Sequence, residues 1–123
     1  MRLTILTVDV DGESHFVDGA LELTAQPFAP PAPPLELSAP IAAEQGLFFR
    51  IPTGWFGDWH PTPCVQYYVQ TTGELEVQVS DGEVRRFLPG DVVFVDDTHG
   101  RGHTTRVIGD VAVCGVYVQL TAP

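Results

Sequence analysis

Apolar and polar side chains alternate along much of the chain with a period of two residues. In the clearest run, 74–79, Leu75, Val77 and Val79 fall on one face and three polar side chains fall on the other. This is the pattern of a strand that buries one face, because successive side chains of a strand point to opposite sides. Similar runs, rich in β-branched and aromatic residues, lie between Gly, Pro and Asp turn signals. They predict strands at 47–51, 65–71, 74–79, 83–87, 92–95, 103–108 and 111–120.

The first 46 residues have a weaker pattern. Short strands are predicted at 14–17 and 20–24, on either side of a tight turn at Asp18-Gly19. Residues 27–34 are rich in proline, which lacks a backbone donor. We expect them to form an extended arm that lies over its own barrel or over a neighbouring subunit. Helical periodicity is absent from the sequence, and residues 41–45 could form one helical turn at most.

Many short strands at near-regular spacing predict an all-β barrel or sandwich, and spacing alone does not separate the two. A chain of 123 residues is long enough for one sizeable core and too short for two. We therefore expect one domain. In it, residues 47–123 form the barrel, and residues 1–46 supply N-terminal strands and the arm that pack on it.

The charge of the chain narrows the range of partners. Sixteen acidic residues against six basic ones give a formal net charge of −10. Such a surface repels nucleic acid and anionic membranes, so neither is an expected partner. The sequence shows no export signal and no apolar run long enough to span a bilayer, which leads us to expect a cytoplasmic protein. In that compartment Cys64 and Cys114 are expected as free thiols.

Two segments of the barrel region carry histidine and glycine at characteristic spacings. In the first, His60 is followed by Thr62 and Gln66, and six residues separate Gln66 from Gly73. In the second, the turn Pro89-Gly90-Asp91 precedes a strand, and Gly100-Arg101-Gly102-His103 follows.

These segments resemble the two motifs of the cupin superfamily, in particular of its small single-domain bacterial members. The resemblance begins at about residue 47 and implies a cupin-type double-stranded β-helix, which is a jelly-roll barrel. It also implies a homodimer, in which the proline-rich arm and the N-terminal strands are candidates for exchange between subunits.

The resemblance further implies a metal site that has lost part of its ligand set. The usual cupin site takes three histidines and a glutamate. Here His60 and His103 stand at histidine positions, Thr62 replaces a histidine, and Gln66 replaces the glutamate. A further departure is Val107, which stands where the family has asparagine.

Two imidazoles and a glutamine oxygen could hold a divalent Fe, Zn, Ni or Mn ion with open positions. Without an anionic ligand, that ion would favour an anionic substrate. Cys64 shares the strand parity of His60 and Gln66, and as a soft fourth ligand it would favour zinc or copper. The alternative is a barrel without metal, in which His60, Gln66 and His103 line a ligand pocket.

Other residues near the two motifs are candidates for the pocket wall and for proton transfer. Tyr68 shares the face of Gln66, and His99 lies close to His103, so these two are predicted to handle protons. Residues 55–59 are interpreted as an aromatic loop that covers a flat ligand. The predicted pocket residues are Trp55, Phe56, Trp59, Thr62, Cys64 and Arg101.

The acidic residues near the two motifs are not expected to bind metal or to transfer protons. Asp58 could orient His60 as a hydrogen-bond acceptor. Asp96 and Asp97 are expected in a solvated turn.

Two functions remain open from the sequence. The first is a metal-dependent enzyme that acts on a small anionic or aromatic organic molecule, as a dioxygenase or as a Lewis-acid lyase, cyclase or isomerase. The second is a non-catalytic barrel that binds or senses a small molecule. A purely structural dimer module would leave the spacing of the two motifs unexplained, and the fold by itself does not decide among functions.

Overall fold

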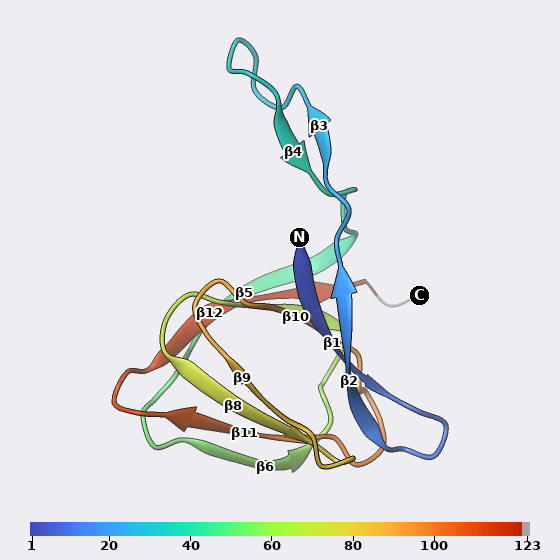
Figure 1. The fold of residues 1–123 in the computed structure, drawn as a ribbon, viewed down its shortest axis with the longest axis vertical. Coiled ribbons are helices and arrows are strands. Elements are labelled where there is room, and N and C mark those ends of the chain that lie inside the picture. The colour runs from blue at the N-terminus through green and yellow to red at the C-terminus, as the bar shows by residue number, and fades with distance from the viewer. Residues whose placement is uncertain (122–123) are drawn as a thin grey trace.

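The computed structural model describes residues 1–121, and within them it contains strands and turns but no helix. A six-stranded sheet has the order β2-β1-β10-β7-β12-β5, and a four-stranded sheet has the order β6-β11-β8-β9. The two sheets face each other and enclose the interior of the barrel (Figure 1). The large sheet contains β1 (Arg2–Val8), β2 (Ser14–Ala20), β5 (Ala43–Ile51), β7 (Gln66–Gln70), β10 (Val92–Val95) and β12 (Val113–Leu120). The small sheet contains β6 (Phe56–His60), β8 (Glu74–Val79), β9 (Val84–Phe87) and β11 (His103–Ile108).

The alternation seen in the sequence explains the core. Along β8, Leu75, Val77 and Val79 are buried, and the polar residues between them are half-buried on the outer face. Strands of the large sheet bury their own alternate residues against them, among them Tyr68 and Val93. The prediction of an all-β jelly-roll barrel is therefore confirmed. Within the described residues, no helix is long and apolar enough to cross a membrane.

The N-terminal strands are part of the large sheet rather than an addition to it. β1 pairs in parallel with β10 and antiparallel with β2. The predicted hairpin turn at Asp18-Gly19 is wrong, because the chain turns earlier, at residues 9–13. There the Asp9 carboxylate accepts hydrogen bonds from the amides of Asp11 and Glu13, at 2.9 and 3.1 Å. This local bonding forms the turn, which contains an Asp-Gly dipeptide of its own at residues 11 and 12.

The proline-rich segment forms the end of an arm that projects from the barrel (Figure 1). Its strands, β3 (Thr24–Gln26) and β4 (Leu35–Leu37), pair only with each other. The arm therefore does not lie over its own barrel. Residues 41–45, which could have formed one helical turn at most, form none, because β5 begins at Ala43 and pairs with β12 from there on. The expected border between residues 46 and 47 consequently lies inside one strand.

His15 links two turns of the barrel by a pair of hydrogen bonds. Its ring Nε2 lies 2.7 Å from a carboxylate oxygen of Asp9, and its Nδ1 lies 2.8 Å from one of Asp81. These bonds, first to Asp9 and then to Asp81, raise the pKa of His15 above 6.5. The charged imidazole thus connects the β1–β2 turn with the β8–β9 turn.

This link predicts a pH dependence of stability. Because the pKa of His15 is higher in the folded state than in the unfolded state, its contribution is complete below about pH 6.5 and is lost as pH rises through the folded value. The melting temperature of the wild type should therefore fall further between about pH 6 and pH 9 than that of His15→Gln. The contribution of His15 to the free energy of unfolding is small, because the imidazole and its carboxylate partners are largely solvated. Equal pH profiles for the two proteins would contradict the link.

Candidate functional site

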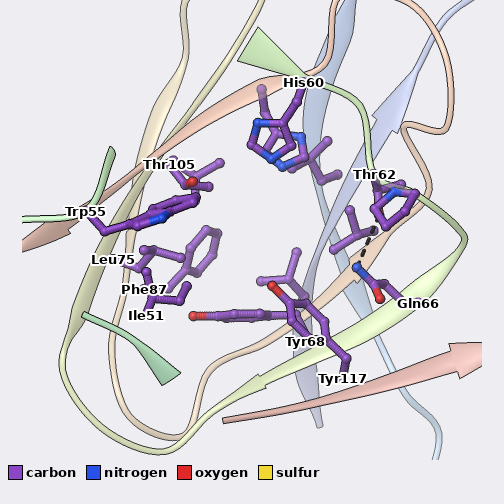
Figure 2. Close-up of a pocket in the computed structure, with 16 residues that line it drawn as sticks. Ile51, Trp55, His60, Thr62, Gln66, Tyr68, Leu75, Phe87, Thr105 and Tyr117 are labelled. Carbon is purple, nitrogen blue, oxygen red and sulfur yellow. Dashed lines mark hydrogen bonds between the residues drawn. The ribbon is translucent and has the colours of Figure 1, made fainter. Parts of the chain in front are cut away.

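A cavity of about 120 Å³ lies inside the barrel between the two sheets. Most of its wall is apolar. His60, Thr62 and Gln66 lie along one side of it, and the hydroxyls of Tyr68, Thr105 and Tyr117 lie on other parts of the wall (Figure 2). The apolar wall comes from both sheets and includes Leu6, Ile51, Leu75, Val77, Phe87, Val93 and Val95. Small-molecule sites in proteins are commonly apolar hollows of this kind, with a few polar groups that fix the orientation of the ligand.

His60 and His103 meet on this side because their strands pair there. His60 is the last residue of β6 and His103 the first of β11, and the two are opposite each other in the antiparallel ladder. Their ring centroids lie 4.6 Å apart. Gly102 makes this approach feasible, since a Cβ at that position would lie 2.2 Å from the carbonyl carbon of His60. The pairing of His60 with His103 therefore requires glycine at position 102.

Both rings are anchored through Nδ1. The Nδ1 of His103 lies 2.6 Å from a carboxylate oxygen of Asp97, and that of His60 lies 2.5 Å from the backbone carbonyl of Asp58. Because a carbonyl only accepts a hydrogen bond, and an ionised carboxylate does the same, each Nδ1 carries the proton. In the neutral rings both Nε2 atoms then keep a lone pair.

Asp97 is one of two residues at the site that sequence reasoning missed. The prediction placed it in a solvated turn, but it is 0% exposed. Its loop folds inward, and its backbone carbonyl accepts a hydrogen bond of 3.1 Å from the amide of Thr62. Among the described residues its Oδ1 has no hydrogen-bond partner. No spacing rule applied to the sequence pointed to this carboxylate, because its contact with His103 depends on the path of the loop.

Gln66 lines the cavity as predicted from its position, but its amide is already bonded within the protein. Its Nε2 donates to the hydroxyl of Thr62 at 3.2 Å, and its Oε1 accepts from Gln119 at 3.0 Å. Figure 2 shows the bond to Thr62 as a dashed line. Cys64 does not line the cavity, and its thiol lies 3.9 Å from the same Oε1. The glutamine thus closes a polar network at the wall of the cavity.

Tyr68 also lines the cavity, but its hydroxyl is bonded within the protein. It donates to the side-chain oxygen of Gln70 at 2.7 Å, and burial raises the pKa of Tyr68 well above its usual value. A phenol held protonated in this way is a poor proton acceptor. Sequence reasoning missed Tyr117, whose hydroxyl points into the cavity (Figure 2) and whose pKa is raised by burial. The regular alternation of β12 could have identified it.

The aromatic segment 55–59 is not a loop over the cavity, since β6 begins at Phe56. Only Trp55 lines the cavity, while Phe56 and Trp59 lie outside it and are 58% and 47% exposed. Gly57 allows Trp55 to lie against β6, because a Cβ there would come within 2.5 Å of the indole.

Two further candidates lie outside the cavity. His99 is exposed, and Arg101 is exposed and pairs with Glu13. Asp58 orients His60 through its backbone rather than its carboxylate, which accepts a hydrogen bond from the amide of Trp59 at 2.9 Å.

The donor set fits a metal ion only in part. Two imidazoles with anchored Nδ1 atoms suit a divalent cation, because metal-binding histidines are held in this manner. However, within residues 1–121 no three His, Cys, Asp or Glu side chains are grouped so as to hold a metal. The residues at the two other ligand positions, Thr62 and Gln66, bond to each other. The described part of the site therefore offers two nitrogen ligands and no anionic one.

Two facing sheets around an internal cavity, with a histidine pair at one end of it, define a jelly-roll barrel. The fold is that of the cupins. Among solved structures, the Schizosaccharomyces pombe Cnp3 cupin domain is similar, with a TM-score of 0.55 and 15% sequence identity over 98% of this chain and 84% of that chain. No family model and no curated protein matches the sequence. The likeness concerns the fold alone.

Proposed function

We propose that this protein binds a small organic molecule in the barrel, with a divalent metal ion held by His60 and His103 at the polar end of that molecule. The observation that best supports the proposal is the anchoring of both rings through Nδ1, at 2.5 and 2.6 Å. Such bonds fix the orientation of each ring and raise its basicity as a ligand. Imidazole nitrogen is a suitable ligand for Zn, Ni and Fe. Mn prefers oxygen ligands and would take them in addition to the two imidazoles.

The expected ligand is mostly apolar and anionic at one end. The wall around the cavity offers aliphatic side chains and the ring of Trp55, which suits a flat or cyclic molecule. Two neutral imidazoles leave the charge of a bound cation uncompensated, so a carboxylate, enolate or phenolate of the ligand completes the site. The hydroxyl of Tyr117 is available inside the cavity to donate a hydrogen bond to that molecule.

The same arrangement supports enzymatic chemistry of the dioxygenase, lyase, cyclase or isomerase type. A bound metal would supply Lewis-acid or oxygen chemistry. The chain itself contributes an apolar wall that excludes water, a hydroxyl at Tyr117, and a buried carboxylate at Asp97 that orients His103. These are the groups that would orient a substrate for reaction.

A second candidate function, ligand binding or proton transfer without metal, is favoured by the bonds of Gln66. Its side-chain oxygen already accepts a hydrogen bond from Gln119, so it is less available as a third metal ligand. In this case the Nε2 of His103, with Asp97 behind it, accepts a proton from the ligand or bonds to it directly.

Metal content separates the two candidates. Protein purified without a histidine tag should take up close to one equivalent of Zn, Ni, Fe or Mn, measured by elemental analysis after removal of free metal. His60→Ala and His103→Ala should each lose at least about 90% of that uptake while keeping the wild-type circular dichroism spectrum.

The matched control is His99→Ala, because His99 is exposed and outside the cavity. It should bind metal as the wild type does. A wild type that takes up none of the four metals would overturn the metal proposal and leave the metal-free function.

A further inference from the structure

A groove of about 730 Å³ lies outside the cavity, where β9 of the small sheet meets the start of β1 and the end of β2 in the large sheet. Arg2, Arg85 and Arg86 line it, and they are three of the six basic residues of the chain. Phe87 lines both the groove and the cavity, so the two hollows share a wall. A protein of net charge −10 repels small anions over most of its surface, so this gathering of arginines is a local departure from the charge of the chain.

The polar lining of the groove comes from the inner face of the large sheet. In the core of the barrel, Leu6 of β1 is buried and lies opposite Phe16 of β2. Thr4 and Arg2 share the face of Leu6, because side chains two and four residues away in a strand point to the same side. Thr4 lies opposite Asp18, and Arg2 lies about 7 Å further along the strand. The inner face thus changes from apolar in the core to polar beyond it.

Arg85 of β9 is held in a fixed position over this polar face. Its Nε donates a hydrogen bond to Glu83 at 2.7 Å, and its Nη1 donates to Asp18 at 2.7 Å and to the hydroxyl of Thr4 at 3.4 Å. The guanidinium carbon lies 5.1 Å from the centroid of the Phe16 ring, and the side chain is 25% exposed. Within the part of the chain that the structure describes, its Nη2 donates no hydrogen bond. The guanidinium therefore keeps donors for a further acceptor.

The acidic residues of the groove do not close it to an anion. Asp91 accepts a hydrogen bond of 2.7 Å from the amide of Leu88, so its carboxylate belongs to the β9–β10 turn. Asp18 is bonded to Arg85, but its side chain is 88% exposed. An ion pair this open to solvent contributes little, and another carboxylate can take the place of Asp18. Among the described residues, Arg2 has no ion-pair partner.

We propose that this groove binds a small dicarboxylate, with one carboxylate on Arg85 and the other on Arg2. In the free protein, Asp18 occupies the place that the first carboxylate of the ligand takes. A guanidinium binds a carboxylate through two parallel N–H groups, which Nη1 and Nη2 of Arg85 supply. Arg86 is not needed for this, because it forms an ion pair of 3.4 Å with Glu76 on the outer face of the small sheet.

An NMR titration of the metal-free protein with succinate, at constant ionic strength, tests this site independently of the proposed function. The wild type should show saturable shifts of the Nε–H signals of Arg85 and Arg2, with a dissociation constant of about 1 mM. Arg85→Gln should raise that constant at least about tenfold, and Arg2→Gln at least about threefold, because each removes one anchoring charge. Asp18→Asn should lower it at least about threefold, because the competing carboxylate is gone.

Arg106→Gln is the matched control, because it removes the same charge from an exposed arginine outside the groove. It should bind succinate as the wild type does, and inorganic phosphate should bind more weakly than succinate, since it is too short to reach both arginines. The dicarboxylate site is overturned if the shifts of the wild type do not saturate, if phosphate binds more tightly, or if Arg106→Gln weakens binding as much as Arg85→Gln. It is also overturned if Asp18→Asn, which alters an exposed side chain and leaves the core intact, does not bind succinate more tightly.

Discussion

Gly102→Ala should lower the free energy of unfolding by about 3–5 kcal/mol, which is a large effect for the addition of one methyl group. The new Cβ would lie 2.2 Å from both the carbonyl carbon and the carbonyl oxygen of His60, and 2.6 Å from the nitrogen of Pro61. These are backbone atoms, so no rotamer change relieves the overlap. The φ angle of Gly102 is +75°, which adds the strain of a left-handed conformation. The ladder between His60 and His103 would have to open.

Gly82→Ala is the control that separates strain from overlap. Gly82 has a φ of +99°, and nothing lies within 4 Å of the position of its added Cβ. This substitution should cost only the conformational strain, about 1–2 kcal/mol. Urea denaturation of the three proteins measures both values. If Gly102→Ala cannot be obtained as a folded protein while Gly82→Ala can, the loss of stability in Gly102→Ala is larger than expected, and the prediction is still supported. Equal stability of the two variants would contradict the close approach.

Asp97→Asn should lower the affinity of the histidine pair for metal by about 10- to 100-fold. The substitution keeps the size of the side chain but removes the charge behind His103. An asparagine amide can donate to Nδ1 as readily as it can accept from it, so the ring is free to carry its proton on Nε2. Competition with a chromophoric chelator measures the affinity for zinc or nickel.

A second measurement makes this prediction independent of metal. Long-range proton–nitrogen NMR spectra of the imidazoles report which ring nitrogen is protonated. In the wild type the neutral ring of His103 should carry its proton on Nδ1, and in Asp97→Asn the Nε2 form should gain population. Asp96→Asn removes a charge from the neighbouring position and makes no bond to His103, so it is the control. A wild-type ring that is already protonated at Nε2 alone would refute the role of Asp97.

The sequence located the histidine pair but not the groups that hold it. His60 and His103 were identified from motif spacing, and their strands bring them into one ladder pair. Gln66 was placed correctly on the inner face by its parity, but parity says nothing of Gln119, which lies 53 positions away and holds its oxygen. Asp97 looked like a surface turn residue because charge in a loop is usually solvated. It is buried where its loop meets another segment, and there its backbone carbonyl accepts a hydrogen bond from the amide of Thr62.

The N-terminal third illustrates the same limit for secondary structure. Asp18-Gly19 is a strong local turn signal, but the pairing of β2 with β1 continues through both residues. Residues 43–46 have a weak strand pattern, and they are extended because β12 offers them a ladder of hydrogen bonds. In each case pairing with a distant strand prevailed over a local preference, as is common for β-structure.

By itself, the sequence determined that this protein is an all-β barrel or sandwich with one apolar and one polar face on strands such as β8. This property follows from side-chain alternation, which the chain carries locally. The choice of the barrel and the histidine pair at its site came from the resemblance of two short motifs to those of the cupins. Only the tertiary structure decided that a buried carboxylate stands behind His103, that Gln66 is bonded within the wall, and that arginines of both sheets line one groove. Those properties arise where segments far apart in the chain come together, and strand periodicity alone does not specify which segments meet.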